Sequence, residues 1–416
     1  MSPPAPLVSP IARLADRWGA PTQHFWLRGA PPRGAVEFDE ETGVWDVHGY
    51  PESVAVLSDP EVFSSDTSRR FLPDPGAYDS SGVLTELDPP EHRVLRKLVN
   101  RAFTPKLVGE MEPWIADVTG ELLDAVDGQD GIELMNDLAY PLPVTVIAGL
   151  LGVPAADRDL FRRWADELFP TAAPPAVRAG DEQTAGIEAA FDLERRMNDY
   201  FAEHVDDRRR HPREDLLSGL VRAETEGERL TGRALSNFVQ LLFLAGYVTT
   251  ALLLGNTVLC LDTHPEGAAL VRRDRTAVPA VIEESLRLMT PFEVVHRVTT
   301  RPTVLGDRTL AEGEMVALWL GAANRDRRVF PRPHAFDPGR GSNVHLGFGR
   351  GIHYCLGASL ARLEGRIAIS ALLDRFPSLR TDPSNPPVFL QSPEVSGARV
   401  LPLLVGRHGG PSSALC

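Results

Sequence analysis

The sequence predicts an α-rich α+β fold, built as one large domain with a long central helix and small peripheral β-sheets. Helical periodicity dominates from about residue 90 onward, and only short strand-like runs interrupt it. No linker divides the 416 residues, because the proline-rich stretches are short and lie between periodic segments. We therefore expect a single domain over 1–416, with a ragged N-terminus at 1–20 and a C-terminal tail at 405–416.

The expected elements follow from periodicity and from turn residues. Helices are expected at 91–101, 106–126, 139–151, 156–168, 184–210, 231–262, 278–288 and 356–375, several of them opened by an Asp, Ser or Thr cap. Strands are expected at 36–38, 44–47, 303–305, 315–320 and 399–404, separated by Gly, Pro and Asp turns.

The segment 238–261 is apolar enough to span a membrane. It contains polar residues, however, and it lacks flanking basic clusters and lies mid-chain among amphipathic helices. A helix that is apolar all round can equally be the buried axis of a large fold, which is the interpretation we favour.

Composition and charge exclude several classes of protein. A net charge of −14 argues against a nucleic-acid or anionic-membrane binder, because bulk repulsion would have to be overcome. The three cysteines, Cys260, Cys355 and Cys416, have no metal-finger spacing, and the N-terminus has no signal-peptide pattern. We expect a cytoplasmic monomer with free thiols and no membrane anchor.

The most informative stretch is 348–357, which reads FGRGIHYCLG. Gly349 and Gly351 allow a tight turn whose amide hydrogens can approach the sulfur of Cys355. Cys355 opens an expected helix, whose dipole and free amides favour the thiolate over the thiol. Gly357 lets that helix lie close to a flat porphyrin, and Phe348 can cover the sulfur from water.

This segment resembles the heme-binding loop of the cytochrome P-450 family, in which a cysteine thiolate ligates the iron. The resemblance extends from about residue 48 to 404. It implies the fold of that family, with the long central helix over heme b (iron protoporphyrin IX). It also implies that Cys355 is the metal ligand, and that Phe348, Gly349, His353 and Gly357 contact the cofactor.

A second motif supports the resemblance. Glu284 and Arg287 have the Glu-x-x-Arg spacing of the family, which puts both charges on one helix face. Arg340 matches the further arginine that completes this network in the family.

Heme carries two propionate carboxylates that need cations or hydrogen-bond donors. His92 and Arg96 lie four apart in the stretch DPPEHRVLR, which together with the following Ala-Phe-Thr-Pro around Phe103 resembles a heme-contacting helix of the bacterial family. Arg297 and His353 match the other two propionate donors.

The stretch 245–250 reads AGYVTT and resembles the oxygen-activating part of the family's central helix. The resemblance implies that Ala245 and Gly246 line the groove for dioxygen, and that Thr249 and Thr250 are catalytic. The position of the usual acid is Val248, which cannot relay a proton. Protons must then come through water held by Thr249, through backbone groups or through a hydroxyl on the substrate.

The resemblance implies that electrons come from a ferredoxin and its NAD(P)H-dependent reductase. A basic patch that would suit an acidic ferredoxin is formed by Arg93, Lys97, Arg101, Lys106 and Arg350. The same patch can also be scattered solubilising charge.

The substrate is expected to be a large, mainly apolar small molecule, with a polyketide or macrolide of secondary metabolism and antibiotic biosynthesis as the working hypothesis. The walls of its pocket are expected within 63–83, 169–183, 247–253, 291–295 and 390–396. The apolar side chains in them are Phe63, Phe71, Phe169, Phe292 and Val294. The Pro/Ala/Gly-rich run at 170–180 is expected to be a lid loop.

Hydroxylation or epoxidation by a monooxygenase is therefore the predicted function, and three alternatives are weighed against it. Peroxygenases of the same fold carry Arg-Pro in place of the acid–threonine pair, and neither residue stands at 248–250. Heme-free homologues that act as binding modules activating a partner lack the cysteine loop, which is intact here. A non-monooxygenase heme reaction, such as oxidative coupling or dehydration, stays open because of Val248.

Overall fold

The computed structural model describes residues 9–68, 80–168, 181–225 and 232–406. The helices in these ranges are α1 (Pro10–Leu14), α2 (Tyr50–Ser58), α4 (Glu91–Ala102), α5 (Pro105–Glu110), α6 (Glu112–Asp124), α7 (Pro141–Leu151), α8 (Arg158–Leu168), α9 (Asp181–Arg210), α10 (Leu216–Thr225), α11 (Gly232–Thr263), α12 (Pro265–Arg273), α13 (Val278–Leu288), α14 (Leu320–Ala323) and α15 (Ala358–Arg375). Short 3-10 or π-helical turns are η1 (Phe25–Arg28), η3 (Met135–Ala139), η4 (Ala155–Asp157), η5 (Arg275–Ala277) and η6 (Gly351–His353).

The strands are short. They are β1 (Val36–Asp39), β2 (Val44–Val47), β3 (Phe63–Ser64), β4 (Gly131–Glu133), β5 (Val294–Thr299), β6 (Thr303–Leu305), β7 (Arg308–Leu310), β8 (Met315–Trp319), β9 (Leu379–Thr381), β10 (Val388–Phe389), β11 (Ala398–Val400) and β12 (Pro402–Val405). The largest sheet has the order β1-β2-β8-β5-β3, with β2 and β8 parallel and the other pairs antiparallel. Two two-stranded sheets and one three-stranded sheet complete the described part of the chain.

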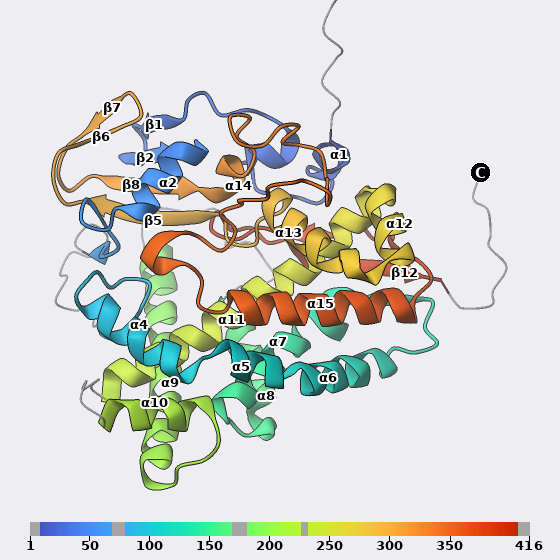
Figure 1. Cartoon of the computed structure of the whole chain (residues 1–416), viewed down its shortest axis with the longest axis horizontal. Coiled ribbons are helices and arrows are strands. Elements are labelled where there is room, and N and C mark those ends of the chain that lie inside the picture. The colour runs from blue at the N-terminus through green and yellow to red at the C-terminus, as the bar shows by residue number, and fades with distance from the viewer. Residues whose placement is uncertain (1–8, 69–79, 169–180, 226–231, 407–416) are drawn as a thin grey trace, which may run out of the picture.

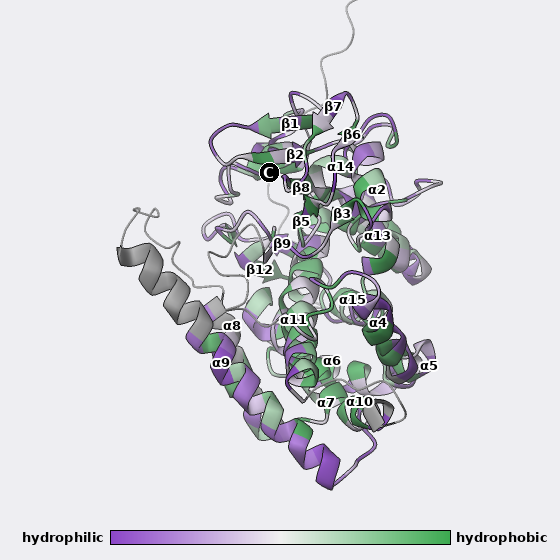
Figure 2. Cartoon of the chain, turned by 90° about the vertical axis from the view of Figure 1, so that its left-hand side faces the viewer, coloured by the Kyte–Doolittle hydropathy of each residue, from purple (hydrophilic) through white to green (hydrophobic). Residues whose placement is uncertain are grey.

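Most of the long helices lie below the five-stranded sheet in Figure 1, whereas α1, α2 and α14 lie at the level of the sheet, and α11 runs through the middle of the helical part. It packs against α7, α9, α13 and α15, and 67% of its most apolar stretch is buried. Figure 2 shows α11 as predominantly hydrophobic, whereas the C-terminal part of α9 on the outside is hydrophilic. The helix is therefore the axis of the core, as predicted, and no membrane is indicated.

The structure corrects several predicted boundaries. The helix expected over 106–126 is two helices, α5 and α6, which are separated at Met111. Pro113 lies in the first turn of α6, where its missing N–H and fixed φ are tolerated only at a helix start. Thr104 caps α5 by accepting a hydrogen bond from the backbone N–H of Leu107 at 3.2 Å. The helix expected from 356 begins instead at Ala358.

The elements missed from the sequence include α2, α10, α12 and β5, together with several shorter helices and strands. Strand β5 is the most instructive of them. It lies inside the five-stranded sheet, yet its burial does not alternate, because Arg297 is only 6% exposed while Val295 and Val298 are partly exposed. A charged residue on the buried side removes the hydrophobic alternation by which strands are predicted.

Candidate active site

The cysteine loop connects the end of the sheet region to α15 (Figure 1). The backbone N–H of Cys355 donates to the carbonyl oxygen of Phe348 at 2.9 Å, which closes the loop on itself. Gly349 and Gly351 both have positive φ, of +68° and +72°. A Cβ at Gly351 would lie 2.2 Å from the carbonyl oxygen of Leu57, so this position requires glycine for two independent reasons.

The sulfur of Cys355 lies at the N-terminus of α15. It accepts hydrogen bonds from the backbone N–H groups of Gly357 and Ala358. The amide of Gly349 donates instead to the carbonyl oxygen of Leu346 at 2.8 Å. The amides that approach the sulfur thus belong to the helix start, whereas the loop glycines shape the turn that brings the sulfur there.

Burial raises the pKa of the Cys355 thiol, and the two amides together with Arg96 and Arg362 act in the opposite direction. Burial is the largest of these influences, so the side chain alone favours the thiol. A bound cation would favour the thiolate, because a thiolate is the form that ligates metals. A half-buried cysteine with amide donors at its sulfur is a suitable ligand for a cofactor metal.

Four cationic or titratable side chains gather beside the cysteine loop. The rings of His92 and His353 are 4.4 Å apart between centroids. Arg96 and Arg297 both lower the pKa of each histidine, although burial is the larger cause. The structure therefore brings together the four predicted propionate donors, from α4, β5 and the cysteine loop.

The protein satisfies only part of the hydrogen-bonding capacity of these four side chains. Among the described residues, both ring nitrogens of His92 are buried without a hydrogen-bond partner. Arg96 donates to the carbonyl oxygen of Tyr354 at 2.8 Å, and Nε2 of His353 lies 2.8 Å from Oγ of Ser65. Burial lowers the pKa of Arg297 to about 10.

Buried donors of this kind need an acceptor, because an unsatisfied buried polar group costs about 1–3 kcal/mol. The carboxylate of Asp88 is nearby, but it accepts from the backbone N–H of Ser65 at 2.9 Å and from the Ser64 hydroxyl. The cluster is thus suited to hold the carboxylates of a ligand. Together with Cys355, these residues fit heme b, which presents two carboxylates and a metal.

The middle of α11 is open on one side. Ala245 is exposed although the helix around it is largely buried, and Gly246 and Thr249 are partly buried. Oγ1 of Thr249 donates to the carbonyl oxygen of Ala245 at 2.6 Å, the usual bond of a helical threonine. A Cβ at Gly357 would meet no atom within 4 Å, so open space also lies beside the start of α15.

Other residues in the same turns of α11 are buried. Val248 and Thr250 are each 4% exposed, and Val248 belongs to the main hydrophobic core. Tyr247 is 3% exposed and packs against Tyr140 and Phe243. Thr249 therefore lies on the open side together with Ala245, whereas Thr250 does not.

The other predicted residues are placed less centrally. Phe103 caps the C-terminus of α4 and packs against the main core. Phe63 was expected in the substrate pocket, but it lies in the smaller core under the five-stranded sheet at 4% exposure. Phe292 is 40% exposed, and Val294 is buried. Phe71, Phe169 and the run 170–180 lie outside the described residues.

The predicted Glu-x-x-Arg network is formed. Glu284 and Arg287 are fully buried and share two hydrogen bonds, of 2.9 and 2.7 Å. Arg340 donates to the same carboxylate at 3.3 Å, and Asn343 does so at 3.1 Å. The network ties α13 to the segment that precedes the cysteine loop.

Sequence reasoning missed Glu283 and Arg362. Both oxygens of Glu283 accept from Arg362, whose guanidinium lies over the ring of Phe348 at 4.4 Å. A signal was present, because Arg362 lies in the second turn of the helix that follows Cys355, close to the cysteine loop in sequence.

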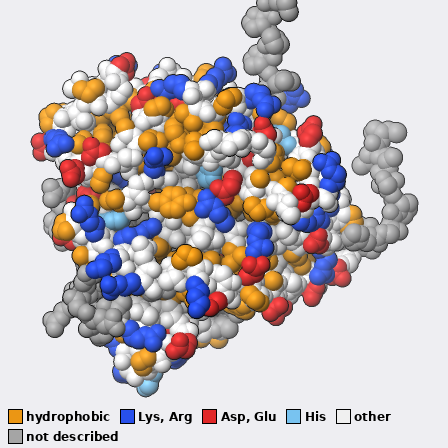
Figure 3. Space-filling view, in the orientation of Figure 1, with side chains coloured by type: hydrophobic (Ala, Val, Ile, Leu, Met, Phe, Trp, Pro, Cys, Tyr) orange, Lys and Arg blue, Asp and Glu red, His pale blue; other side chains and the backbone are white. Residues whose placement is uncertain are grey.

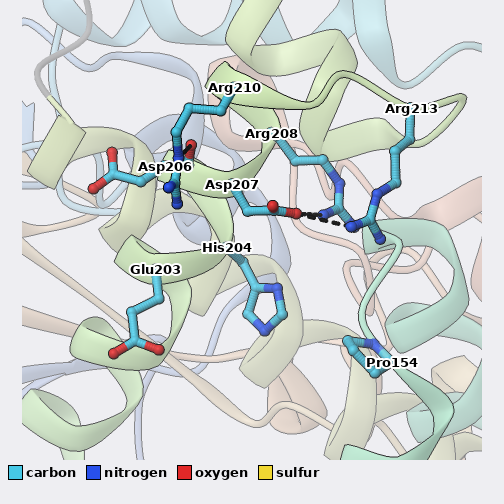
Figure 4. Close-up of a pocket in the computed structure, with 8 residues that line it drawn as sticks. All are labelled: Pro154, Glu203, His204, Asp206, Asp207, Arg208, Arg210 and Arg213. Carbon is cyan, nitrogen blue, oxygen red and sulfur yellow. Dashed lines mark hydrogen bonds and ion pairs between the residues drawn. The ribbon is translucent and has the colours of Figure 1, made fainter.

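A recess of about 430 Å³ lies at the C-terminal end of α9 (Figure 4). It is lined by Pro154, Glu203, His204, Asp206, Asp207, Arg208, Arg210 and Arg213. Its charges compensate one another, with Asp207 accepting from Arg208 and Arg213 at 2.6 and 2.9 Å. It shares no residue with the cysteine loop or with the cation cluster.

Comparison with known proteins is consistent with this geometry. The family model described as Cytochrome P450 matches residues 35–400. Cyclomarin C epoxidase CymV of Salinispora arenicola is 42% identical over 394 residues, which cover 94% of this chain and 98% of the relative. Erythromycin C-12 hydroxylase of Saccharopolyspora erythraea is 38% identical, over 89% of this chain and 91% of the relative. The crystal structure of HmtT, involved in himastatin biosynthesis, superposes with a TM-score of 0.84 at 50% identity, covering 94% of this chain and 99% of that one.

Proposed function

This chain belongs to the cytochrome P450 family, and on that premise we propose that Cys355 would hold the heme iron of a monooxygenase that oxidises a large, mainly apolar natural product. The chain is a heme-dependent P450 monooxygenase that works with redox-partner proteins on a small molecule. Heme, when bound, supplies the reduction and activation of dioxygen. The observation that carries the proposal is the Cys355 sulfur at the amide-lined start of α15.

His92, Arg96, Arg297 and His353 would hold the heme propionates. Their burial, their mutual proximity and the unpartnered nitrogens of His92 support this role. Charge-assisted hydrogen bonds to carboxylates would also offset the burial of Arg297.

Thr249 is the residue that we propose to deliver protons on the open side of α11. Its hydroxyl donates to Ala245 O and can still accept from a water molecule, because a hydroxyl carries one donor and two acceptor sites. The exposure of Ala245 leaves such a water room to lie beside the helix. Val248, buried in the core, supports a route that needs no carboxylate at this position.

We propose hydroxylation or epoxidation of a polyketide or macrolide in secondary metabolism. Relatives act on cyclomarin C and erythromycin. The partly buried side chains of Leu241, Leu242 and Leu244 near the open part of α11, and the exposed Phe292, would offer apolar contacts to such a substrate.

A ferredoxin, itself reduced by an NAD(P)H-dependent reductase, is the proposed electron donor. Arg93, Lys97 and Arg101 are exposed at four-residue spacing on α4, and Arg350 is exposed in the cysteine loop. Figure 3 shows blue side chains gathered over α4. Lys106 contributes less, because it lies 3.7 Å from Glu110. A positive face on a chain of net charge −14 would orient an acidic partner. We further propose a cytoplasmic monomer whose chain acts as one domain.

The test is a screen of macrolides and other large apolar compounds for a shift in heme absorbance, followed by turnover of the hits under isotopically heavy dioxygen with ferredoxin and reductase. One heavy oxygen atom in the product is expected. A product free of heavy oxygen would contradict the oxygenase proposal. Cys355→Ser serves as the control protein and should give no product.

A further inference from the structure

A second ion-pair network lies beside the cysteine loop, next to the Glu284 network but separate from it. Glu283 accepts from Nε and Nη2 of Arg362 at 2.7 and 2.8 Å, which is the paired geometry that carboxylate and guanidinium favour. It also lies 3.1 Å from Nε2 of His345. We call Glu283, His345 and Arg362 the Glu283 clamp.

The clamp holds the loop at three points along its length. At the start of the loop, Nδ1 of His345 accepts from the backbone N–H of Gly347 at 3.1 Å. In the middle, the guanidinium of Arg362 lies 4.4 Å from the centroid of the Phe348 ring. Next to the ligand, Nη1 of Arg362 donates to the hydroxyl of Tyr354 at 3.2 Å.

We propose that the Glu283 clamp positions the cysteine loop, and that the charge of Arg362, which the clamp fixes beside Cys355, raises the reduction potential of the heme. This inference rests on the heme–thiolate centre and on no particular substrate. Glu283 and Arg362 are positioning residues, because they act through Phe348, Tyr354 and Cys355.

The two adjacent glutamates of α13 have separate partners. Glu284 binds Arg287, Arg340 and Asn343, so it holds the segment before the loop. Glu283 binds a residue of α15 and a residue at the loop start, so it holds the loop itself. Arg362 also contacts the Phe348 ring and the Tyr354 hydroxyl, and these additional contacts distinguish the pair from a solvent-exposed ion pair.

The electrostatic direction follows from the charges. Reduction adds an electron to the heme–thiolate centre, so a nearby positive charge favours the reduced state. Arg362 lies beside the ligand, because it donates to the hydroxyl of Tyr354, the residue next to Cys355, at 3.2 Å. Glu283 carries the opposite charge and should act in the opposite direction from a greater distance, since Arg362 links it to Tyr354 beside the ligand.

The experiment compares the heme reduction potential of the holoenzyme with that of Arg362→Gln, Arg362→Lys and Glu283→Gln. Arg362→Gln should lower the equilibrium constant for reduction about threefold to tenfold, and a tenfold change corresponds to about 59 mV for a one-electron couple. Arg362→Lys keeps the charge and should stay near the parent value. Glu283→Gln should shift the potential in the opposite direction to Arg362→Gln.

Arg366→Gln is the matched control. Arg366 lies one turn further along α15 and pairs with Glu112 at 2.7 Å, away from the loop. Arg366→Gln should leave the heme reduction potential unchanged. Equal shifts for Arg362→Gln and Arg366→Gln, or equal potentials for Arg362→Gln and Arg362→Lys, would overturn the electrostatic role.

The positioning role has its own spectroscopic readout. Arg362→Lys cannot form the paired contact with Glu283, so its ferrous carbon-monoxide complex should lose the long-wavelength thiolate band faster than the parent does. A band as durable as in the parent would overturn this role. If Arg362→Gln fails to bind heme, the comparison of Arg362→Lys with Glu283→Gln decides, and identical potentials in these two would overturn the proposal.

Discussion

Cys355 is the residue on which the chemistry depends. Cys355→Ser should remove the long-wavelength band of the ferrous carbon-monoxide complex, because serine is a poor substitute for a thiolate ligand. Cys260→Ala is the control, since Cys260 is fully buried in α11 and should leave the band intact. Retention of the band in Cys355→Ser would show that another residue ligates the iron.

Substitutions of Arg297 and Arg96 test the proposed propionate site. Each charge-assisted hydrogen bond contributes about 1.5–3 kcal/mol, so Arg297→Ala should weaken heme retention about tenfold or more. The measurement is the rate of heme transfer to an acceptor protein. Arg301→Ala, an exposed change just beyond the end of β5, should have no effect. Full heme occupancy in the Arg96→Ala, Arg297→Ala double variant would exclude the site.

Val248 tests whether the missing acid matters. Its side chain faces the core, so Val248→Glu should lower thermal stability, because a buried unpaired carboxylate costs several kcal/mol. The amount of product per NAD(P)H should stay unchanged, since the new carboxyl group would be buried among core residues without contact to solvent. Val248→Ala controls for lost packing. A gain in coupling from Val248→Glu would contradict the water route through Thr249.

In the alternative mechanism, a hydroxyl group of the substrate supplies the protons, and variation of the substrate can distinguish it from the water route. Analogues without a hydroxyl near the oxidation site should couple as well as those with one if water supplies the protons. Thr249→Ala should uncouple both kinds alike. Coupling that depends on the substrate hydroxyl as strongly as on Thr249 would favour the substrate as the proton donor.

At the scale of a single element, α15 carries a buried acid whose titration can be measured. Burial raises the pKa of Glu364 from 4.5 to about 8, and its side chain is 2% exposed. The folded protein therefore holds this proton more tightly than the unfolded chain does. The resulting stability is complete below pH 4.5 and is lost as the pH rises through 8.

Glu364→Gln has no charge to bury. Its thermal stability should therefore increase relative to that of the parent as the pH rises from 5.5 to 8.5. Each unit of pKa shift is worth about 1.4 kcal/mol, so the relative gain should be measurable in the thermal midpoint. Glu266→Gln, on the exposed side of α12, should show no such trend. A constant difference between parent and Glu364→Gln at all pH values would contradict the prediction.

At the scale of the whole molecule, the distribution of charge governs electron delivery. Reversing Arg93 and Lys97 to Glu should slow reduction by an acidic ferredoxin and flatten its salt dependence, while substrate affinity stays unchanged. The control is the reversal of Arg273 and Arg308, two exposed arginines on α12 and β7. If the parent and the variant with Arg93 and Lys97 reversed were reduced at equal rates, the exposed cations of α4 would be ordinary solvated charges with no role in binding the electron donor.

The long-range contacts of the site depend on the fold as a whole and could not be read from the chain. His92, Arg297 and His353 come from three elements separated by up to 261 positions, and their rings and charges meet only after the sheet and α4 have packed. The resemblance to a family identified them one by one. Their common burial, and the unpartnered nitrogens of His92, are properties of the packed structure.

The sequence by itself determined whatever is encoded within a few turns of chain. The cysteine loop, the Glu284–Arg287 pair and the apolar axis α11 are contiguous patterns, so spacing and periodicity suffice to predict them. Only the tertiary structure decided the burial of Arg297 in β5, the burial of Val248 and the pairing of Glu283 with Arg362. The physical reason is that burial and charge pairing depend on which distant segments pack together, and no local pattern records that choice.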